Sequence, residues 1–189
     1  MTETPNPYIV DADTLTGEMR PIRQCVIALG SNLGERHIKL QGAIDALRDT
    51  PGVFLTAVSS IYETDPVNAP EGSDKFLNAV VLADSTLSAH LLLERALAIE
   101  TAYGRERTAE RNAPRTLDVD IILIGDRRAD DEDLVLPHPR AHERAFVLAP
   151  WVEIEPEAEL PGHGRISDLL GNVDQSGVAK REDITLEIG

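Results

Sequence analysis

The order of its apolar segments limits what this chain can fold into more than any other feature of the sequence. The run QCVIALG at 24–30 has the composition of a short buried strand. In the next segment, 35–49, Leu40, Ile44 and Leu47 recur at the spacing of one helix face. The sequence therefore predicts a strand followed by an amphipathic helix, which ends before Pro51 and Gly52.

The next four segments predict two more strands, a second helix and a last strand. Residues 53–64 are rich in β-branched and aromatic side chains, and a loop with proline and glycine separates them from a second apolar run at 76–84. These two runs predict a hairpin with a long connection. A second helix is predicted at 88–104, with Ser88 at its N-cap, and a last strand lies within 114–125.

The resulting order is β-α-β-β-α-β, which is the ferredoxin-like arrangement of an antiparallel sheet with its helices on one face. We therefore expect an α+β fold. Residues 1–23 form a flexible N-terminal extension in this interpretation, residues 24–160 form one domain, and residues 161–189 form a C-terminal extension. The segment after the last core strand adds a short strand and one or two helical turns.

Composition excludes several classes of function. The chain has 189 residues, of which 42% are hydrophobic, and a formal net charge of -15. A strongly acidic surface repels nucleic acid and anionic membranes, so we expect neither as a partner. The sequence also lacks an apolar run of membrane-spanning length and a signal peptide, which predicts a cytoplasmic protein.

Two aspartates interrupt the last apolar strand, in the stretch PRTLDVDIILIG. Because side chains alternate along a strand, Asp118 and Asp120 share one face while Val119 and Ile121 share the other. Two carboxylates one pleat apart, about 7 Å from each other, can hold one or two cations between them. A solvated start of the strand is the alternative interpretation of this pair.

Four arginines, Arg105, Arg107, Arg111 and Arg115, precede the acidic pair within eleven residues. Carboxylates that hold Mg²⁺ opposite arginines that bind phosphate oxygens are typical of phosphoryl transfer, with a nucleoside triphosphate as the ligand. A solvated loop of mixed charge remains the alternative for the arginines.

The stretch LPHPRAHERAFVLAP, residues 136–150, adds His138, Arg140, His142 and Arg144. Pro139 opposes a helix through both histidines, so phosphate binding fits this stretch better than zinc. GSNLGE at 30–35 follows a strand and precedes a helix, where it is either a simple turn or an anion-binding turn.

Six segments in this order resemble the 6-hydroxymethyl-7,8-dihydropterin pyrophosphokinase family of folate biosynthesis. They are IALGSNLGER, YETDPV, FLNAVV, GRER, PRTLDVDIILIG and LPHPRAHERAFVLAP. The resemblance implies an ATP-dependent diphosphotransferase, which transfers the β,γ-diphosphate of ATP to the hydroxymethyl group of a reduced pterin and releases AMP. It also implies a ferredoxin-like fold, a monomer, and two Mg²⁺ ions per site.

The resemblance assigns roles by position. The catalytic residues would be Arg105, Arg115, Asp118 and Asp120, of which the two aspartates would also bind the metal. Those that line the ATP site would be Glu100, Arg107, Arg111, His138 and Arg144. Those that line the pterin slot would be Gly30, Thr64, Asp65, Val67, Phe76, Asn78 and Phe146. The chain departs from some members in having Asn112 and Ala113 where they carry a tryptophan before GPR.

The slot also has a physical rationale that does not depend on the family. A flat heterocycle with an amide-like edge needs aromatic faces, which Phe76 and Phe146 supply. It also needs a side chain with both a donor and an acceptor, which Asn78 supplies. Two other functions stay open at this point: a nucleotide-sugar transferase that uses D-x-D, and a ferredoxin-like module that binds a small ligand without turnover.

Overall fold

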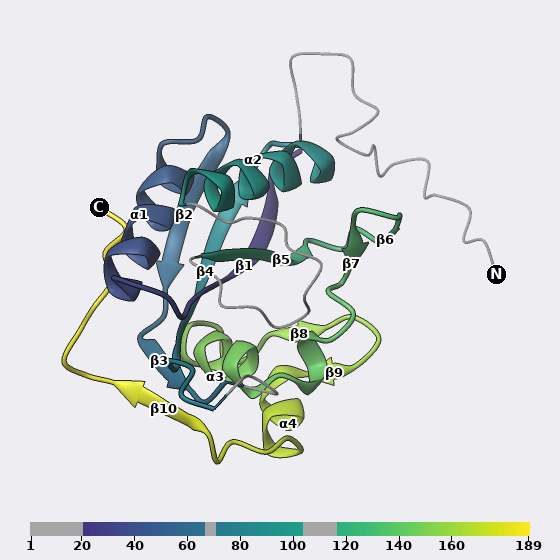
Figure 1. The fold of residues 1–189 in the computed structure, drawn as a ribbon. Coiled ribbons are helices and arrows are strands. Elements are labelled where there is room, and N and C mark those ends of the chain that lie inside the picture. The colour runs from purple at the N-terminus through teal and green to yellow at the C-terminus, as the bar shows by residue number, and fades with distance from the viewer. Residues whose placement is uncertain (1–20, 67–70, 104–116) are drawn as a thin grey trace.

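Six strands form one antiparallel sheet, with helices on both of its faces (Figure 1). The structure is a computed structural model and describes residues 21–66, 71–103 and 117–189. β4 pairs with β1, β2 and β3, while β1 also pairs with β5 and β3 with β10.

The elements of the core are β1 (Arg23–Ser31), α1 (Arg36–Arg48), β2 (Val53–Val58), β3 (Ile61–Thr64), β4 (Phe76–Ser85), α2 (Ala89–Ala102) and β5 (Asp118–Ile124). After them come β6 (Ala129–Asp130), β7 (Val135–Leu136), the 3-10 turn η2 (Ala141–Glu143), α3 (Ala145–Ile154), β8 (Glu159–Leu160), β9 (Gly164–Arg165), α4 (Ile166–Gly171) and β10 (Val178–Arg181).

The predicted ferredoxin-like core is confirmed. Its strands lie in the order β5, β1, β4 and then β2 with β3, and α1 and α2 cover one face. Leu40, Ile44 and Leu47 of α1 are fully buried in this layer, as their spacing predicts. Ser88 caps α2, because its Oγ accepts a hydrogen bond from the backbone N–H of Leu91 over 3.2 Å.

The predicted strand at 53–64 is divided into two strands, which the sequence pattern did not indicate. Ser59 and Ser60 lie between β2 and β3. The hydroxyl of Ser59 accepts from the backbone N–H of Val80, and Ser60 donates to the carboxylate of Glu153. The backbone N–H of Ser59 still donates to the carbonyl of Val80 over 2.9 Å, so side-chain hydrogen bonds supplement the backbone bonds here, and those of Ser60 attach the break to α3.

The chain after β5 covers the second face of the sheet. α3 and α4 pack there on Val26, Val80 and Ile122, and Trp151 of α3 is fully buried in the same hydrophobic cluster. This layer is more extensive than the short strand and helical turns expected from the sequence. Residues 161–189 also take part, since Ile166 is buried and β10 pairs with β3.

No helix in the three described ranges is both long enough and apolar enough to cross a lipid bilayer.

Candidate active site

The acidic pair lies on the α3 face of the sheet. Val119 and Ile121 enter the layer under α1 and α2, whereas Ile122 packs on the α3 side after a register shift against Val26 and Ile27. Strand alternation therefore turns Asp118 and Asp120 toward the α3 side, as the sequence predicts. Both side chains are only partly buried, so they can be reached by a ligand.

Gly30 brings the acidic pair and the predicted pterin slot together. It lies opposite Asp118 on one side and Asn78 on the other, because β1 is the strand between β5 and β4. A Cβ placed on Gly30 would be 2.9 Å from Oδ1 of Asn78, 3.9 Å from Cδ1 of Phe76 and 4.0 Å from Cβ of Asp118. The absence of a side chain at this position leaves room for Oδ1 of Asn78, whereas the distances to Phe76 and Asp118 are ordinary contacts.

Three residues predicted for the pterin slot come from adjacent ends of β3 and β4. Nδ2 of Asn78 donates to Oγ1 of Thr64 over 2.7 Å, and both side chains are buried. Because Nδ2 is engaged in this bond, the amide orientation is fixed, with Oδ1 toward Gly30. Phe76 stands opposite Thr64 in the ladder, which places its ring at the mouth of the same end of the sheet.

Two further predicted residues flank this end. Asp65 directs its carboxylate to Lys75, with Oδ1 and Nζ 3.3 Å apart. Phe146 lies in the first turn of α3, and its ring centroid is 5.6 Å from the guanidinium carbon of Arg144. α3 packs over β3 and β4, so Phe146 approaches from the side of the sheet to which Asn78 points.

A separate cleft of about 320 Å³ opens beside β5, between α2 and the β6–β7 hairpin. Glu100, His138 and Asp120 all line it, so the structure brings together two of the predicted ATP-site residues and one of the acidic pair. Glu100 is 3% exposed, and its Oε1 accepts from the backbone N–H of Val119 over 2.9 Å. Its carboxylate therefore fixes the start of β5 as well as one wall of the cleft.

Apolar side chains form most of the remaining wall of the cleft, and sequence analysis did not single them out. Among them are Leu93, Leu97, Val119, Ile121, Leu134 and Val135. Leu93 and Leu97 are four residues apart on α2, which is a signal that helical spacing could have given. Glu132 and Asp133 also line the cleft, so its apolar wall is bordered by acidic side chains. Apolar walls combined with placed polar groups are typical of small-molecule sites.

The electrostatics of the cleft favour a neutral histidine beside a charged arginine. Burial, followed by the positive charges of Arg144 and Arg140, lowers the pKa of His138 from 6.5 to about 4. Its Nδ1 accepts from the backbone N–H of Arg140 over 3.1 Å, so in the neutral ring Nε2 carries the proton and can donate it. Burial also lowers the pKa of Arg144, while the nearby carboxylates of Asp120 and Asp118 act in the opposite direction.

Sequence comparison assigns this arrangement to a family. Residues 26–156 match the model of the 7,8-dihydro-6-hydroxymethylpterin-pyrophosphokinase (HPPK) family. The chain belongs to the HPPK family. The matched range contains every described residue that the sequence analysis placed in a substrate site.

Curated relatives in the HPPK family match over most of their length. The chain is 41% identical over 156 residues to the 2-amino-4-hydroxy-6-hydroxymethyldihydropteridine pyrophosphokinase of Methylorubrum extorquens, covering 82% of this chain and 97% of the relative. It is 46% identical over 145 residues to the enzyme of the same name from Bacillus subtilis, covering 77% and 86%.

Solved structures support the same fold at much lower identity. A variant of Plasmodium falciparum HPPK-DHPS, solved with STZ-DHP, superposes with a TM-score of 0.64 at 13% identity. The match covers 82% of this chain and 46% of that one, so the chain spans less than half of this longer protein. At such identity the likeness speaks for the HPPK fold alone.

Part of the predicted HPPK site lies outside the described residues. This part comprises Val67, Arg105, Arg107, Arg111 and Arg115. Within the described ranges, no group of three or more histidine, cysteine, aspartate or glutamate residues gathers as a metal site. Asp118 and Asp120 nonetheless suit Mg²⁺, because this ion takes one or two protein carboxylates and completes its shell with phosphate oxygens and water.

Proposed function

We propose that this protein transfers the β,γ-diphosphate of ATP to the hydroxymethyl oxygen of 6-hydroxymethyl-7,8-dihydropterin, giving AMP and the pterin diphosphate in folate biosynthesis. Membership of the HPPK family and the names of its relatives support this reaction. The same family match gives no support to a nucleotide-sugar transferase.

One observation about the site supports the proposal: the acidic pair lies between two separate groups of the predicted site residues. Asp118 faces the end of the sheet where Gly30 and Asn78 meet. Asp120 lines the cleft that also contains Glu100 and His138. A pterin on the first side and a nucleotide on the second would therefore meet at the two carboxylates.

The described residues have distinct tasks in this proposal. Phe76 and Phe146 would hold the flat pterin, and Asn78 and Thr64 would read its polar edge, while Gly30, Asp65 and Val67 complete the slot. Glu100 and the apolar wall would hold the nucleotide base. Nε2–H of His138 and the guanidinium of Arg144 would donate to phosphate oxygens, together with Arg107 and Arg111.

The transfer is an in-line substitution at the β-phosphorus of ATP. The hydroxymethyl oxygen forms the new bond to phosphorus, the bond to the α,β-bridging oxygen breaks, and AMP leaves with that oxygen while the hydroxyl proton passes to water. Positioning and charge stabilisation supply most of the rate enhancement, with Arg105 and Arg115 acting on the transferring phosphates. Two Mg²⁺ ions held by Asp118 and Asp120 would neutralise the triphosphate and lower the pKa of the attacking hydroxyl.

The first experiment follows AMP formation from ATP, Mg²⁺ and 6-hydroxymethyl-7,8-dihydropterin. We expect pterin-dependent AMP from the wild type, and at least about a hundredfold loss of turnover in Asp118→Asn and in Asp120→Asn. Asp84→Asn is the matched control, since Asp84 lies in β4 opposite Gln24, at the other end of the sheet. It should keep wild-type turnover.

The assay distinguishes the proposed reaction from ligand binding without turnover, and it tests the role of the acidic pair separately. A ligand-binding module would bind the pterin without producing AMP, which would contradict the proposed reaction. Near wild-type turnover of both Asp118→Asn and Asp120→Asn at saturating Mg²⁺ would contradict the role of the acidic pair alone.

The domain limits at residues 23 and 160, the monomeric state and the cytoplasmic location are part of the same proposal. Size-exclusion chromatography with light scattering would test the monomer, since a dimer would double the 20.6 kDa mass. Limited proteolysis would test the first limit, which predicts cleavage within 1–23, whereas 161–189 should be protected because Ile166 is buried and β10 pairs with β3.

A further inference from the structure

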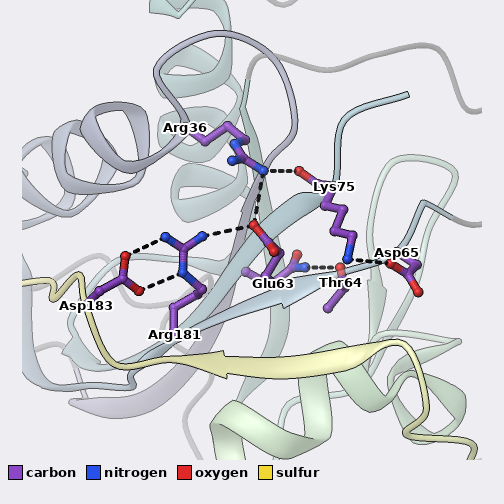
Figure 2. Close-up of polar contacts among 8 residues, drawn as sticks. Arg36, Glu63, Thr64, Asp65, Lys75, Arg181 and Asp183 are labelled. Carbon is purple, nitrogen blue, oxygen red and sulfur yellow. Dashed lines mark hydrogen bonds and ion pairs between the residues drawn. The ribbon is translucent and has the colours of Figure 1, made fainter. Parts of the chain in front are cut away.

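Behind the pterin slot, on the face of the sheet covered by α1, two arginines converge on one glutamate (Figure 2). Glu63 is the residue of β3 that precedes Thr64, and its side chain points to the face opposite that of Thr64. Its Oε2 lies 3.6 Å from Nη1 of Arg36 and accepts from Nη1 of Arg181 over 3.0 Å. The Glu63 side chain is 24% exposed, so these contacts are partly shielded from water.

Arg36 also reaches the other strand of the slot. Its Nη1 donates to the backbone carbonyl of Lys75 over 2.6 Å, and Lys75 directly precedes Phe76 at the start of β4. Arg36 is the first residue of α1. One side chain on a helix thereby contacts both strand ends, next to Thr64 on one and next to Phe76 on the other.

The C-terminal strand enters the same network. Arg181 is the last residue of β10, and its guanidinium makes two hydrogen bonds to the carboxylate of Asp183 in addition to the bond to Glu63. β10 pairs with β3, and the backbone N–H of Asp65 donates to the carbonyl of Gly177 just before β10 begins. The outer edge of β3, which carries Thr64, is therefore held by both backbone and side-chain contacts with β10.

We infer that Arg36 is a positioning residue for the pterin. Through the Lys75 carbonyl and Glu63, it fixes the spacing between the ends of β3 and β4, while Arg181 holds Glu63 from the other side. This inference rests on the proposed function, since it concerns the slot in which the pterin would lie. Arg36 itself lies behind the sheet, and its role is to hold Phe76 and Thr64 where they can contact the ligand.

We expect an effect on pterin binding alone, because the cleft beside β5, in which the nucleotide would bind, is separate from Arg36 and its contacts. The cleft is lined by residues of α2, β5 and the segment 132–139, none of which belongs to the Arg36 network. Loosening the ends of β3 and β4 should therefore weaken pterin binding and leave nucleotide binding unchanged. A general loss of stability would weaken both.

The test compares Arg36→Met with Arg48→Met. Both arginines lie on α1, and Arg48 has ion pairs with Asp45 and Asp49 at 3.1 and 3.3 Å, away from the slot. Dissociation constants would be measured by calorimetry for the pterin, with a non-hydrolysable ATP analogue and Mg²⁺ present, and for the analogue alone. We expect Arg36→Met to weaken pterin binding about tenfold. Analogue binding should stay within about twofold of wild type.

Two further variants separate positioning from simple stabilisation. Arg36→Lys keeps one cationic donor for the Lys75 carbonyl and should recover part of the lost affinity. The double variant of Arg36→Met with Arg181→Met should weaken pterin binding by less than the product of the single effects, because both arginines act through Glu63.

The outcomes distinguish this inference from the proposed function. If Arg36→Met binds the pterin as tightly as wild type, or loses both ligands equally, Arg36 is not a positioning residue. A double variant whose loss equals the product would overturn the link from Arg36 to β10. If the wild type neither binds the pterin nor forms AMP, the proposed function fails, and the inference fails with it.

Discussion

Adding a single methyl group at Gly30 should separate pterin binding from nucleotide binding. The Cβ of Gly30→Ala would lie 2.9 Å from Oδ1 of Asn78, a distance at which one of the two groups must move. Asn78 is not free to rotate, because it is 6% exposed and its Nδ2 donates to Thr64 over 2.7 Å. The strain therefore falls on the amide that is proposed to read the pterin edge.

The magnitude follows from two opposing effects. Overpacking a buried site by one methyl group costs about 1–3 kcal/mol. Gly30 is not among the glycines with positive φ, so alanine is compatible with its backbone and returns roughly 0.4–1 kcal/mol by restricting the unfolded chain. We expect a net loss in the free energy of unfolding of up to about 2.6 kcal/mol. If the Asn78 amide is displaced, pterin affinity should fall about 5- to 100-fold.

Urea unfolding and pterin calorimetry together test this prediction. The same methyl group would lie 4.0 Å from Cβ of Asp118, an ordinary contact, so binding of the ATP analogue should be unaffected. Asn78→Ala removes the obstructing oxygen, and in that background Gly30→Ala should no longer destabilise the fold. Wild-type pterin affinity in Gly30→Ala, or an equal stability loss in both backgrounds, would refute the reasoning.

Three other predictions concern a helix contact, a titrating group and a helix cap. A Cβ on Gly42 would lie 1.7 Å from the hydroxyl oxygen of Tyr103, so the overpacking cost of roughly 1–3 kcal/mol opposes a gain of about 1 kcal/mol in helix propensity, and Gly42→Ala should lower the free energy of unfolding by up to about 2 kcal/mol. In a Tyr103→Ala background the same change should stabilise the helix by about 1 kcal/mol, and urea unfolding that gives the same sign in both backgrounds would contradict this contact. The pKa of His138 in the folded protein, about 4, is below the ordinary value of 6.5. As the pH is lowered, the unfolded chain therefore takes up this proton before the folded protein does, and the free energy of unfolding decreases as the pH decreases from 6.5 to 4. His138→Asn should make urea-unfolding profiles flatter over this range, whereas parallel profiles would show that His138 is not buried as described. Ser88→Ala removes the acceptor for the N–H of Leu91 and should destabilise the fold by about 1 kcal/mol in thermal or urea unfolding, and an unchanged midpoint would exclude the cap.

Local sequence patterns were sufficient for the core of the fold and for the face of the acidic pair. Helical spacing predicted which residues of α1 are buried, and strand alternation predicted that Asp118 and Asp120 point to the same face. Both are properties of neighbouring residues, which a sequence displays directly.

The parts that sequence reasoning missed depend on contacts between distant segments. The division of β2 from β3 depends on Glu153, which lies on α3 and bonds to Ser60 and Tyr62. β10 is a short strand whose place beside β3 is not encoded by its own periodicity. The roles of Arg105, Arg107, Arg111 and Arg115 lie outside the described residues and stay predictions.

The position of β10 also has a consequence for the order in which the site is assembled during synthesis. β3 and β4 emerge from the ribosome early, but the outer edge of β3 can be paired only after a strand from far along the chain has been made. Until then this edge exposes unpaired backbone groups to other nascent chains, which is a known route to aggregation. A chain shortened before Gly177 would keep both aspartates and the cleft beside β5, and we expect its defect to be a poor yield of folded protein.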